Sequence, residues 1–355
     1  MGDIFLSASK IKQAQSCSWK YWCSYELKLP QKGNDGSSRG SVCHLVYELL
    51  GKDRHRKHYN KIITSGTIHG SRAVLKLVEH HASKLNVSDE ENMEMIDMMI
   101  VQGLLYDFFG DSKEKPSDDI SEKEFNLKID EEGKKYNIRG FIDKLFLYSK
   151  NKKALIRDFK TSKQVYKGKE ISDNLQNLMY CLAVKKLYPK YSDILVEFVF
   201  VKFDLEEDLL GNPGEGVLKM EKISDNELEG FEYQLSSIQN YLENFDEEEA
   251  ISNFAADQDY PKDGTFGGPL MCGKQGYKKS RGEHIKDSKG NLIPNYICEY
   301  RNPFDYYAMY DDKGKLVKCY YSEEDAPDLK DGFKLEKKSY EGCPHFQQKE
   351  NAFLV

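Results

Sequence analysis

Three neighbouring segments of this chain alternate between apolar and polar residues or run apolar throughout. They span residues 124–129, 136–147 and 154–159, and turn-forming residues separate them. Segments of this length and pattern are typical of β-strands joined by short connections. Three consecutive strands must bury one face or both faces of a sheet, so we expect a sheet at the centre of the fold.

The segments around these strands predict helices. The spacing of apolar residues predicts helices in six segments: 7–28, 40–51, 70–86, 89–110, 173–189 and 225–255. A further strand is expected at 194–203. The basic run at 51–61 is interpreted as a solvated loop, with contact to a phosphate backbone as the alternative. This order of elements predicts an α/β fold in which helices flank a mixed central sheet.

Composition limits the classes of function. The 355 residues are 39% apolar and 31% charged, as in a soluble globular protein, and the net charge is −7. This charge argues against a surface that is basic throughout, but a local basic groove could still bind nucleic acid. We expect no membrane association and a cytoplasmic location, because no apolar run approaches the ~20 residues of a membrane span and no signal peptide opens the chain. No phosphate-binding Gly-x-x-x-x-Gly-Lys-Ser/Thr motif of a motor ATPase is present.

Acidic and basic residues stand near the ends of two predicted strands. Asp143 follows Gly140 in the second strand, and Asp158 and Lys160 end the third. Asp158 and Lys160 are two positions apart, so their side chains leave the same face of a strand. Carboxylates bind a hard divalent cation, and a nearby ammonium group can orient water or neutralise charge. This combination suits metal-assisted hydrolysis of a phosphodiester bond.

Four motifs that include these residues resemble the RecB branch of the PD-(D/E)XK nuclease superfamily. In chain order they are Arg39-Gly40-Ser41-Val42-Cys43-His44, Gly140-Phe141-Ile142-Asp143, Asp158-Phe159-Lys160-Thr161-Ser162 and Gln176-Asn177-Leu178-Met179-Tyr180. Each motif is weak alone, but four in the right order are jointly improbable by chance. The resemblance covers about residues 1–205. It implies a restriction-endonuclease-like core.

The resemblance also implies roles for the motif residues. The metal ligands would be His44, Asp143, Asp158 and the carbonyl of Phe159, and the metal would be Mg²⁺ or Mn²⁺. Lys160 would position water or stabilise the transition state. Gln176 and Tyr180 would contact the DNA strand or hold Lys160 in place.

Three further residues near the motifs are weighed as accessories. Glu48 and Glu124 could support the site from outside the ligand shell, although a solvated or structural role is the simpler interpretation of each. Lys163, just past the Asp-x-Lys motif, is a candidate phosphate contact.

The N-terminus resembles a second feature of this family. Ser7-Ala8-Ser9-Lys10-Ile11 and the segment from Cys17 to Tyr25 resemble the opening of its iron–sulfur members, which include AddB-type and CRISPR-associated RecB-like nucleases. Ser18 replaces the proline of that motif. In these relatives one N-terminal cysteine joins three C-terminal cysteines around a 4Fe–4S cluster. The resemblance therefore implies Cys17 as a ligand, with Cys23 in reserve.

The last hundred residues are poor in helical periodicity and contain four cysteines. We expect a nuclease domain at 1–255 and a cysteine-bearing C-terminal lobe at 256–355 that packs on the N-terminal helix. Cys272, Cys298 and Cys343 are the expected partners of Cys17. Cys319 ranks lower because it lies in a predicted hairpin strand. These cysteines are tens of residues apart, unlike those of the family, so a structural Zn²⁺ held by all four C-terminal cysteines is the alternative.

These observations predict a metal-dependent DNA nuclease. The expected activity is that of an exonuclease on single strands or duplex ends, in DNA replication, recombination or repair, with a helicase or recombination protein as a partner. The alternative is a nuclease-fold DNA-binding or scaffold subunit that keeps a structural zinc or iron–sulfur site. The presence of every motif residue favours the enzyme.

Overall fold

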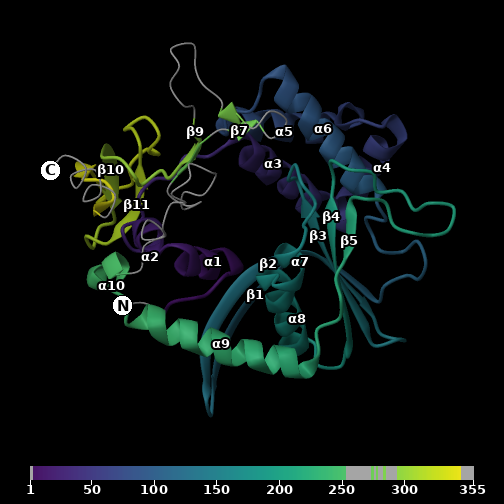
Figure 1. Cartoon of the computed structure of the whole chain (residues 1–355). Helices are drawn as coiled ribbons and strands as arrows, with labels where there is room; N and C mark the ends of the chain where they lie inside the picture. Colours follow the sequence, from purple (N-terminus) through teal and green to yellow (C-terminus); the bar gives the residue numbers. More distant parts are fainter. Residues whose placement is uncertain (1–2, 253–272, 276, 279–282, 285–293, 345–355) are drawn as a thin grey trace. The chain divides into compact units, whose positions relative to one another are not determined.

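The computed structural model describes residues 3–252, 273–275, 277–278, 283–284 and 294–344 (Figure 1). The chain divides into two compact units. Unit 1 comprises Met1–Ala8 and Gly33–Asn240, and unit 2 comprises Ser9–Lys32 and Tyr241–Val355. The predicted division of the chain into 1–255 and 256–355 stays a prediction.

A five-stranded mixed sheet forms the centre of unit 1. Its strands, in spatial order, are β1 (Asp118–Glu131), β2 (Lys134–Tyr148), β3 (Lys153–Lys160), β4 (Asp193–Phe200) and β5 (Val217–Lys219). The pair β3–β4 is parallel and the other neighbouring pairs are antiparallel. The predicted α/β fold with a mixed sheet flanked by helices is confirmed, and it is consistent with a restriction-endonuclease-like core.

The first two strands form a hairpin that is longer than expected. Glu131 pairs with Lys134, so a two-residue turn connects the strands. Gly133 lies in this turn with a φ of +76°, a backbone conformation that glycine adopts at little cost. Most residues of β1 are exposed or half-buried. For this reason the alternation of apolar residues predicted only residues 124–129 of this strand.

One face of the sheet packs against the N-terminal helices of unit 1. They are α3 (Asp35–Leu50), α4 (Arg56–Ser65), α5 (Arg72–Lys84) and α6 (Glu90–Leu105), with short 3₁₀ turns η2 (Asp53–His55) and η3 (Ile68–Gly70). Phe159 of β3 contributes to their apolar core, where its ring lies 4.4 Å from that of Tyr47 in α3. The prediction of a loop at 51–61 was wrong over most of its length. The helix α4 forms there because it buries Ile62 on one side, while the basic residues of the helix stay at the surface.

The other face is covered by α8 (Leu175–Leu187), which follows the short helix α7 (Lys169–Ser172). Successive residues of a strand point to opposite faces, so Asp158 faces α8 while Phe159 faces α3. A direct hydrogen bond from Tyr180 of α8 to Asp158 agrees with this placement.

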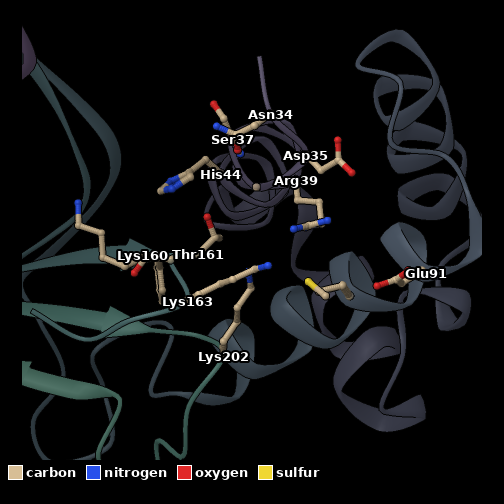
Figure 2. Close-up of a pocket in the computed structure, with 14 residues that line it drawn as sticks. Asn34, Asp35, Ser37, Arg39, His44, Glu91, Lys160, Thr161, Lys163 and Lys202 are labelled. Atoms are coloured by element: carbon tan, nitrogen blue, oxygen red, sulfur yellow. The ribbon is translucent and has the colours of Figure 1, made fainter. Parts of the chain in front are cut away.

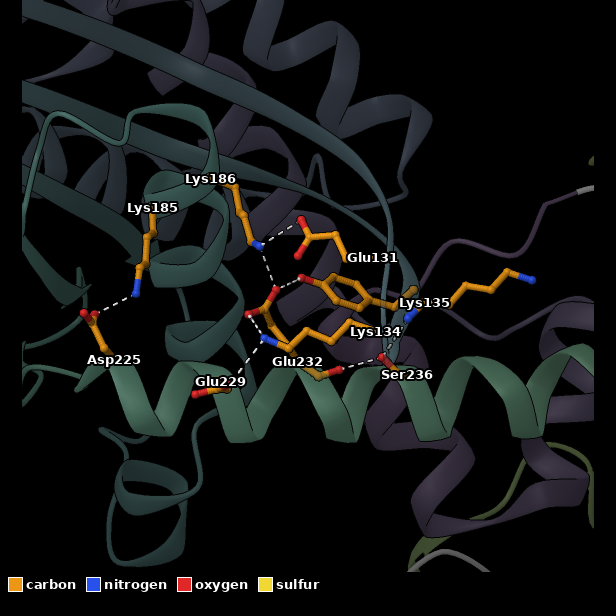
Figure 3. Close-up of polar contacts among 10 residues, drawn as sticks. Glu131, Lys134, Lys135, Lys185, Lys186, Asp225, Glu229, Glu232 and Ser236 are labelled. Carbon is orange, nitrogen blue, oxygen red and sulfur yellow. Dashed lines mark hydrogen bonds and ion pairs between the residues drawn. The ribbon is translucent and has the colours of Figure 1, made fainter.

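The long helix α9 (Asp225–Glu243) is held to the sheet and to α8 by charged contacts (Figure 3). Glu232 is nearly buried and accepts a hydrogen bond from the Tyr136 hydroxyl at 2.6 Å. Its carboxylate also lies 2.8 Å from Lys186 Nζ and 3.3 Å from Lys134 Nζ. Each partner comes from β2 or α8, so this network fixes α9 on the frame that carries the Gln176–Tyr180 motif.

Unit 2 combines short helices with small sheets. Its elements are α1 (Ala8–Ser16), α2 (Ser18–Tyr21), the π-helical turn η1 (Trp22–Glu26), α10 (Glu247–Ser252), β6 (Gly273–Gln275), β7 (Tyr277–Lys278), β8 (Glu283–His284), β9 (Pro294–Ile297), β10 (Phe304–Tyr310), β11 (Leu316–Tyr320) and β12 (Lys334–Tyr340). The strands β11, β10 and β12 form an antiparallel sheet in that order. The helix predicted at 7–28 is interrupted at Cys17, whose backbone is extended and which caps the start of α2.

In the described part of the chain, every helix is too short or too polar to cross a membrane.

Candidate active site

Asp143 lies within β2 rather than near its end as predicted, and β2 places it beside Asp158, which is near the end of β3. Lys144 of β2 pairs with Arg157 of β3, and Asp143 and Asp158 are the next residues of the two strands. The helix α3 reaches the same end of the sheet through Gly40. A Cβ atom at Gly40 would lie 2.8 Å from Thr161 Oγ1, so glycine is required for this close approach.

Asp143 is held between the backbone of β3 and a side chain of α3. Its Oδ2 accepts a hydrogen bond from the Phe159 N–H at 2.7 Å, and its Oδ1 lies 3.2 Å from His44 Nδ1. Burial disfavours the charged imidazole, but the charge and hydrogen bond of Asp143 outweigh it and raise the pKa of His44 to about 9. A metal that binds this imidazole must displace its proton.

Asp158 lies in a network that includes Lys160 and the two motif residues of α8. Its Oδ1 accepts hydrogen bonds from the Tyr180 hydroxyl at 2.7 Å and from Gln176 Nε2 at 2.9 Å. Its Oδ2 lies 2.6 Å from Lys160 Nζ. Lys160 also donates a hydrogen bond to Gln176 Oε1 at 2.7 Å. Gln176 therefore holds both charged side chains of the Asp-x-Lys motif, Asp158 and Lys160.

Burial governs the protonation of this network. Asp158 is 2% exposed, and burial together with the charge of Asp143 raises its pKa, although the ammonium group of Lys160 opposes this. Burial lowers the pKa of Lys160, but the charge of Asp158 outweighs it and raises the value. The protonation of each group therefore depends on the other, because burial penalises either charge on its own.

Glu122 is a neighbour of this site that the sequence analysis missed. The flanking pairs Ser121–Lys144 and Lys123–Ile142 place it opposite Asp143 across β1 and β2. Burial and the charge of Asp143 raise its pKa to about 7. Its φ of +49° is unusual for a residue within a strand, so no alternation of apolar residues could have predicted where it points.

The two glutamates weighed from the sequence lie differently. Glu48 forms an ion pair at 2.6 Å with Lys52, which lies just past the end of α3, and its charge raises the pKa of Glu122. Glu124 is exposed on β1.

A pocket of about 740 Å³ opens beside these residues (Figure 2). His44, Phe159 and Lys160 contribute to its wall. Lys163, the candidate phosphate contact, also lines it, together with Lys202, which no sequence motif marked.

The chemistry of the donor groups suits a divalent cation. The carboxylates of Asp143 and Asp158 are oxygen donors of the kind that bind such a cation, and Lys160 Nζ, 2.6 Å from Asp158 Oδ2, balances part of their charge. The described residues nevertheless contain no group of three or more histidine, cysteine, aspartate or glutamate side chains arranged to hold a metal. The carboxylates instead hold the protein partners named above, so metal ligation by His44, Asp143, Asp158 and the Phe159 carbonyl stays a prediction.

Several cysteines of unit 2 lie near one another. Burial raises the pKa of the Cys23 thiol, and the neighbouring thiols of Cys298, Cys343 and Cys17 raise it further. Cys298 and Cys343 are linked through Arg301, whose N–H donates to the Cys298 carbonyl and whose carbonyl accepts from the Cys343 N–H.

The other four cysteines lie apart from this group or outside the residues that the structure describes. Cys319 lies in β11 with its sulfur 3.7 Å from the Leu27 carbonyl oxygen, in a hairpin strand as predicted. Cys43 and Cys181 are buried in α3 and α8, where they are small residues of the core. Cys272 lies outside the residues that the structure describes.

Comparison with known proteins gives the family. A model of the PD-(D/E)XK nuclease superfamily matches residues 5–266, which is most of the chain, and the chain belongs to this superfamily. Membership supports a hydrolytic nuclease. The assignment to the RecB branch and the iron–sulfur cluster stay predictions.

Other comparisons add little. No curated protein matches the chain. Among solved structures, the crystal structure of protein VC1899 from Vibrio cholerae is similar, with 13% identity and a TM-score of 0.22. The match covers 56% of this chain and 48% of that one, so the chain spans about half the length of that protein. At this TM-score the likeness supports neither a fold nor a function.

Proposed function

We propose that this chain is a divalent-metal-dependent nuclease that degrades DNA from its ends. The observation that carries the proposal is the network between β2 and the end of β3, in which Asp143, Asp158 and Lys160 meet His44 of α3. Mg²⁺ or Mn²⁺ held by His44, Asp143, Asp158 and the Phe159 carbonyl would supply charge stabilisation and an activated water. DNA processing in replication, recombination or repair, with a helicase or recombination partner, extends the same proposal.

The protein residues have separate tasks in this proposal. Lys160 holds its proton because Asp158 stabilises the charged form, so it can orient a water molecule or neutralise a phosphate oxygen. Gln176 and Tyr180 position Asp158 and Lys160 through their hydrogen bonds, and they need not touch the reacting atoms. Removing either residue would loosen both charged groups, because Gln176 bonds to each of them and to the Tyr180 hydroxyl.

The proposal is tested with matched DNA substrates. Purified protein is incubated with linear single strands, linear duplexes and closed circular duplexes, with Mg²⁺, with Mn²⁺ or with a chelator. We expect degradation of linear DNA only when metal is present, because the carboxylates need a cation to bind a phosphate. Cleavage of closed circles would make the enzyme an endonuclease, and cleavage in the chelator would exclude the metal. Binding without cleavage under every condition would favour the alternative of a DNA-binding or scaffold subunit.

We also propose a metal centre in unit 2 with Cys17, Cys298 and Cys343 as ligands. The fourth ligand is Cys272, with Cys23 as the alternative because its thiol neighbours the other three. Soft thiolate ligands suit a 4Fe–4S cluster or Zn²⁺, and the iron–sulfur resemblance at the N-terminus favours the cluster. The visible absorption of anaerobically purified protein separates the two, since Zn²⁺ is colourless.

Substituting the proposed ligands should release the metal. We expect Cys17→Ser and Cys343→Ser each to lose bound metal and to melt at lower temperature, because the binding energy of such a centre contributes to folding. Cys319→Ser is the matched control, since its thiol contacts the Leu27 carbonyl. Metal analysis and thermal melting of the three variants measure this. Full metal content in Cys17→Ser together with loss in Cys319→Ser would favour a zinc site made only of C-terminal cysteines.

A further inference from the structure

The pocket beside the candidate active site is lined by several positively charged side chains, although the protein as a whole is acidic. Its wall includes Arg39, Lys163 and Lys202, and Figure 2 shows the two lysines extending toward Arg39. These residues come from α3, the segment after β3 and the segment after β4, so the fold itself gathers them. Asp35 and Glu91 also line the pocket.

Arg39 has a buried hydrogen-bond donor that lacks an acceptor. Its side chain is 7% exposed, and one terminal guanidinium nitrogen donates to Asn92 Oδ1. The Nε atom is buried without a hydrogen-bond partner in the part of the chain that the structure describes. Buried donors of this kind are rare in folded proteins, and an arginine fork is well suited to phosphate oxygens.

Lys202 lies among like charges. Burial lowers the pKa of Lys202, and the positive charges of Arg39 and Lys163 lower it further. Like charges held together repel, so their grouping carries a cost that a bound anion would remove. Of the two acidic residues, Asp35 accepts a hydrogen bond from Asn92 Nδ2 at 3.4 Å through its Oδ2.

The position of the pocket indicates which anion it takes. His44 and Lys160 belong both to its wall and to the site proposed for phosphodiester cleavage. A volume of about 740 Å³ is that of a ligand pocket and exceeds the needs of a phosphate ion. A nucleic-acid strand that places one phosphate at the carboxylates carries further phosphates along the same backbone.

We propose that Arg39, Lys163 and Lys202 bind a phosphate of the nucleic-acid strand that neighbours the scissile phosphate. This inference rests on the proposed nuclease function and adds a positioning site to it. The phosphate could be internal to the strand or the terminal phosphate of a DNA end, and both have the same charge-bearing oxygens. Contacts of this kind set the register of the strand rather than its sequence.

The proposal is tested by DNA binding in a chelator, where cleavage does not interfere. Fluorescence anisotropy measures the affinity of a labelled single strand for the full chain and for Lys202→Met and Lys163→Met. We expect each variant to bind about three- to tenfold more weakly and to show a salt dependence shallower by about 0.7 in the log–log slope, as for one lost phosphate contact. Lys76→Met in α5 is the control, because it removes one exposed positive charge from another helix of unit 1.

Whether the bound phosphate is terminal or internal is decided by comparing strands with a 5′-phosphate, a 5′-hydroxyl or a 3′-phosphate. If the pocket takes a terminal phosphate, removing that phosphate should weaken binding by wild type and have no effect on Lys202→Met. If it takes an internal phosphate, the end group should not matter and Lys202→Met should still bind weakly. Affinities of Lys202→Met and Lys163→Met equal to that of Lys76→Met, in a protein that cleaves DNA, would overturn the pocket proposal alone. A wild-type chain that neither binds nor cleaves nucleic acid would overturn the proposed function and this site with it.

Discussion

Replacing Asp158 with asparagine should reduce DNA cleavage at least about a thousandfold, which corresponds to the loss of about 4 kcal/mol of transition-state stabilisation. Asparagine has nearly the same shape as aspartate and can still accept the hydrogen bonds of Gln176 and Tyr180. It lacks the negative charge that faces Lys160 and that a divalent cation would require. The measurement is the initial rate of degradation of linear DNA in Mg²⁺ and in Mn²⁺.

Binding and folding should survive the same change. We expect DNA affinity in a chelator to stay the same or to increase, because one negative charge near the phosphate is removed. Asp130→Asn is the matched control, since Asp130 is exposed on β1 and its substitution changes the net charge equally. A purified Asp158→Asn protein that cleaves DNA as fast as Asp130→Asn would disprove the assignment of the site.

The centre of the fold could be predicted because its signal is local. Five of the eight residues of β3 are buried and the others are half-buried, so the strand is a largely apolar run in which Arg157, Asp158 and Lys160 stand out. The strand β4 likewise ends in five buried residues. Where both faces of a strand are covered, the sequence reveals the strand and marks its polar residues as exceptions.

The beginnings of helices were harder to predict. Helix α3 starts at Asp35, within a run of small residues that resembles a loop. Its first turn is stabilised by Asn34, whose side chain accepts a hydrogen bond from the Ser37 N–H at 3.0 Å. This cap and the packing of the helix outweigh the weak helix propensity of Gly36 and its neighbours.

The parts of the site that could not be predicted depend on long-range geometry. Lys202 follows a strand with no motif around it, and its approach to Arg39 and Lys163 is a consequence of the parallel pairing of β3 and β4. Glu122 faces Asp143 through a backbone conformation that sequence patterns do not report. Motif residues are recognisable one at a time, whereas a pocket exists only after the strands are in register.

Arg157, next to Asp158, forms a buried ion pair that anchors the catalytic end of β3. It is 2% exposed, and its Nε lies 2.5 Å from Glu197 Oε1 on the neighbouring strand β4, where the two residues are paired in register. The guanidinium group also contacts the Tyr106 carbonyl at 3.1 Å and the Asp107 carboxylate at 3.6 Å. Glu197 is therefore the closest of two carboxylates that compensate a buried charge.

Glu197→Ala should lower the free energy of unfolding by about 3–5 kcal/mol, because it leaves a buried guanidinium group with only part of its compensation. The control Glu207→Ala breaks an exposed ion pair, in which the side chain of Lys113 is 79% exposed and that of Glu207 is 42% exposed. This control should lower the free energy of unfolding by less than about 1 kcal/mol. Urea unfolding is best followed by far-ultraviolet circular dichroism, since both tryptophans, Trp19 and Trp22, lie in unit 2. Equal midpoints for the two variants would show that Asp107 and the backbone carbonyls suffice for Arg157. A selective loss of stability in Glu197→Ala would instead mean that the ion pair across β3 and β4 holds the strand end from which Asp158 and Lys160 project.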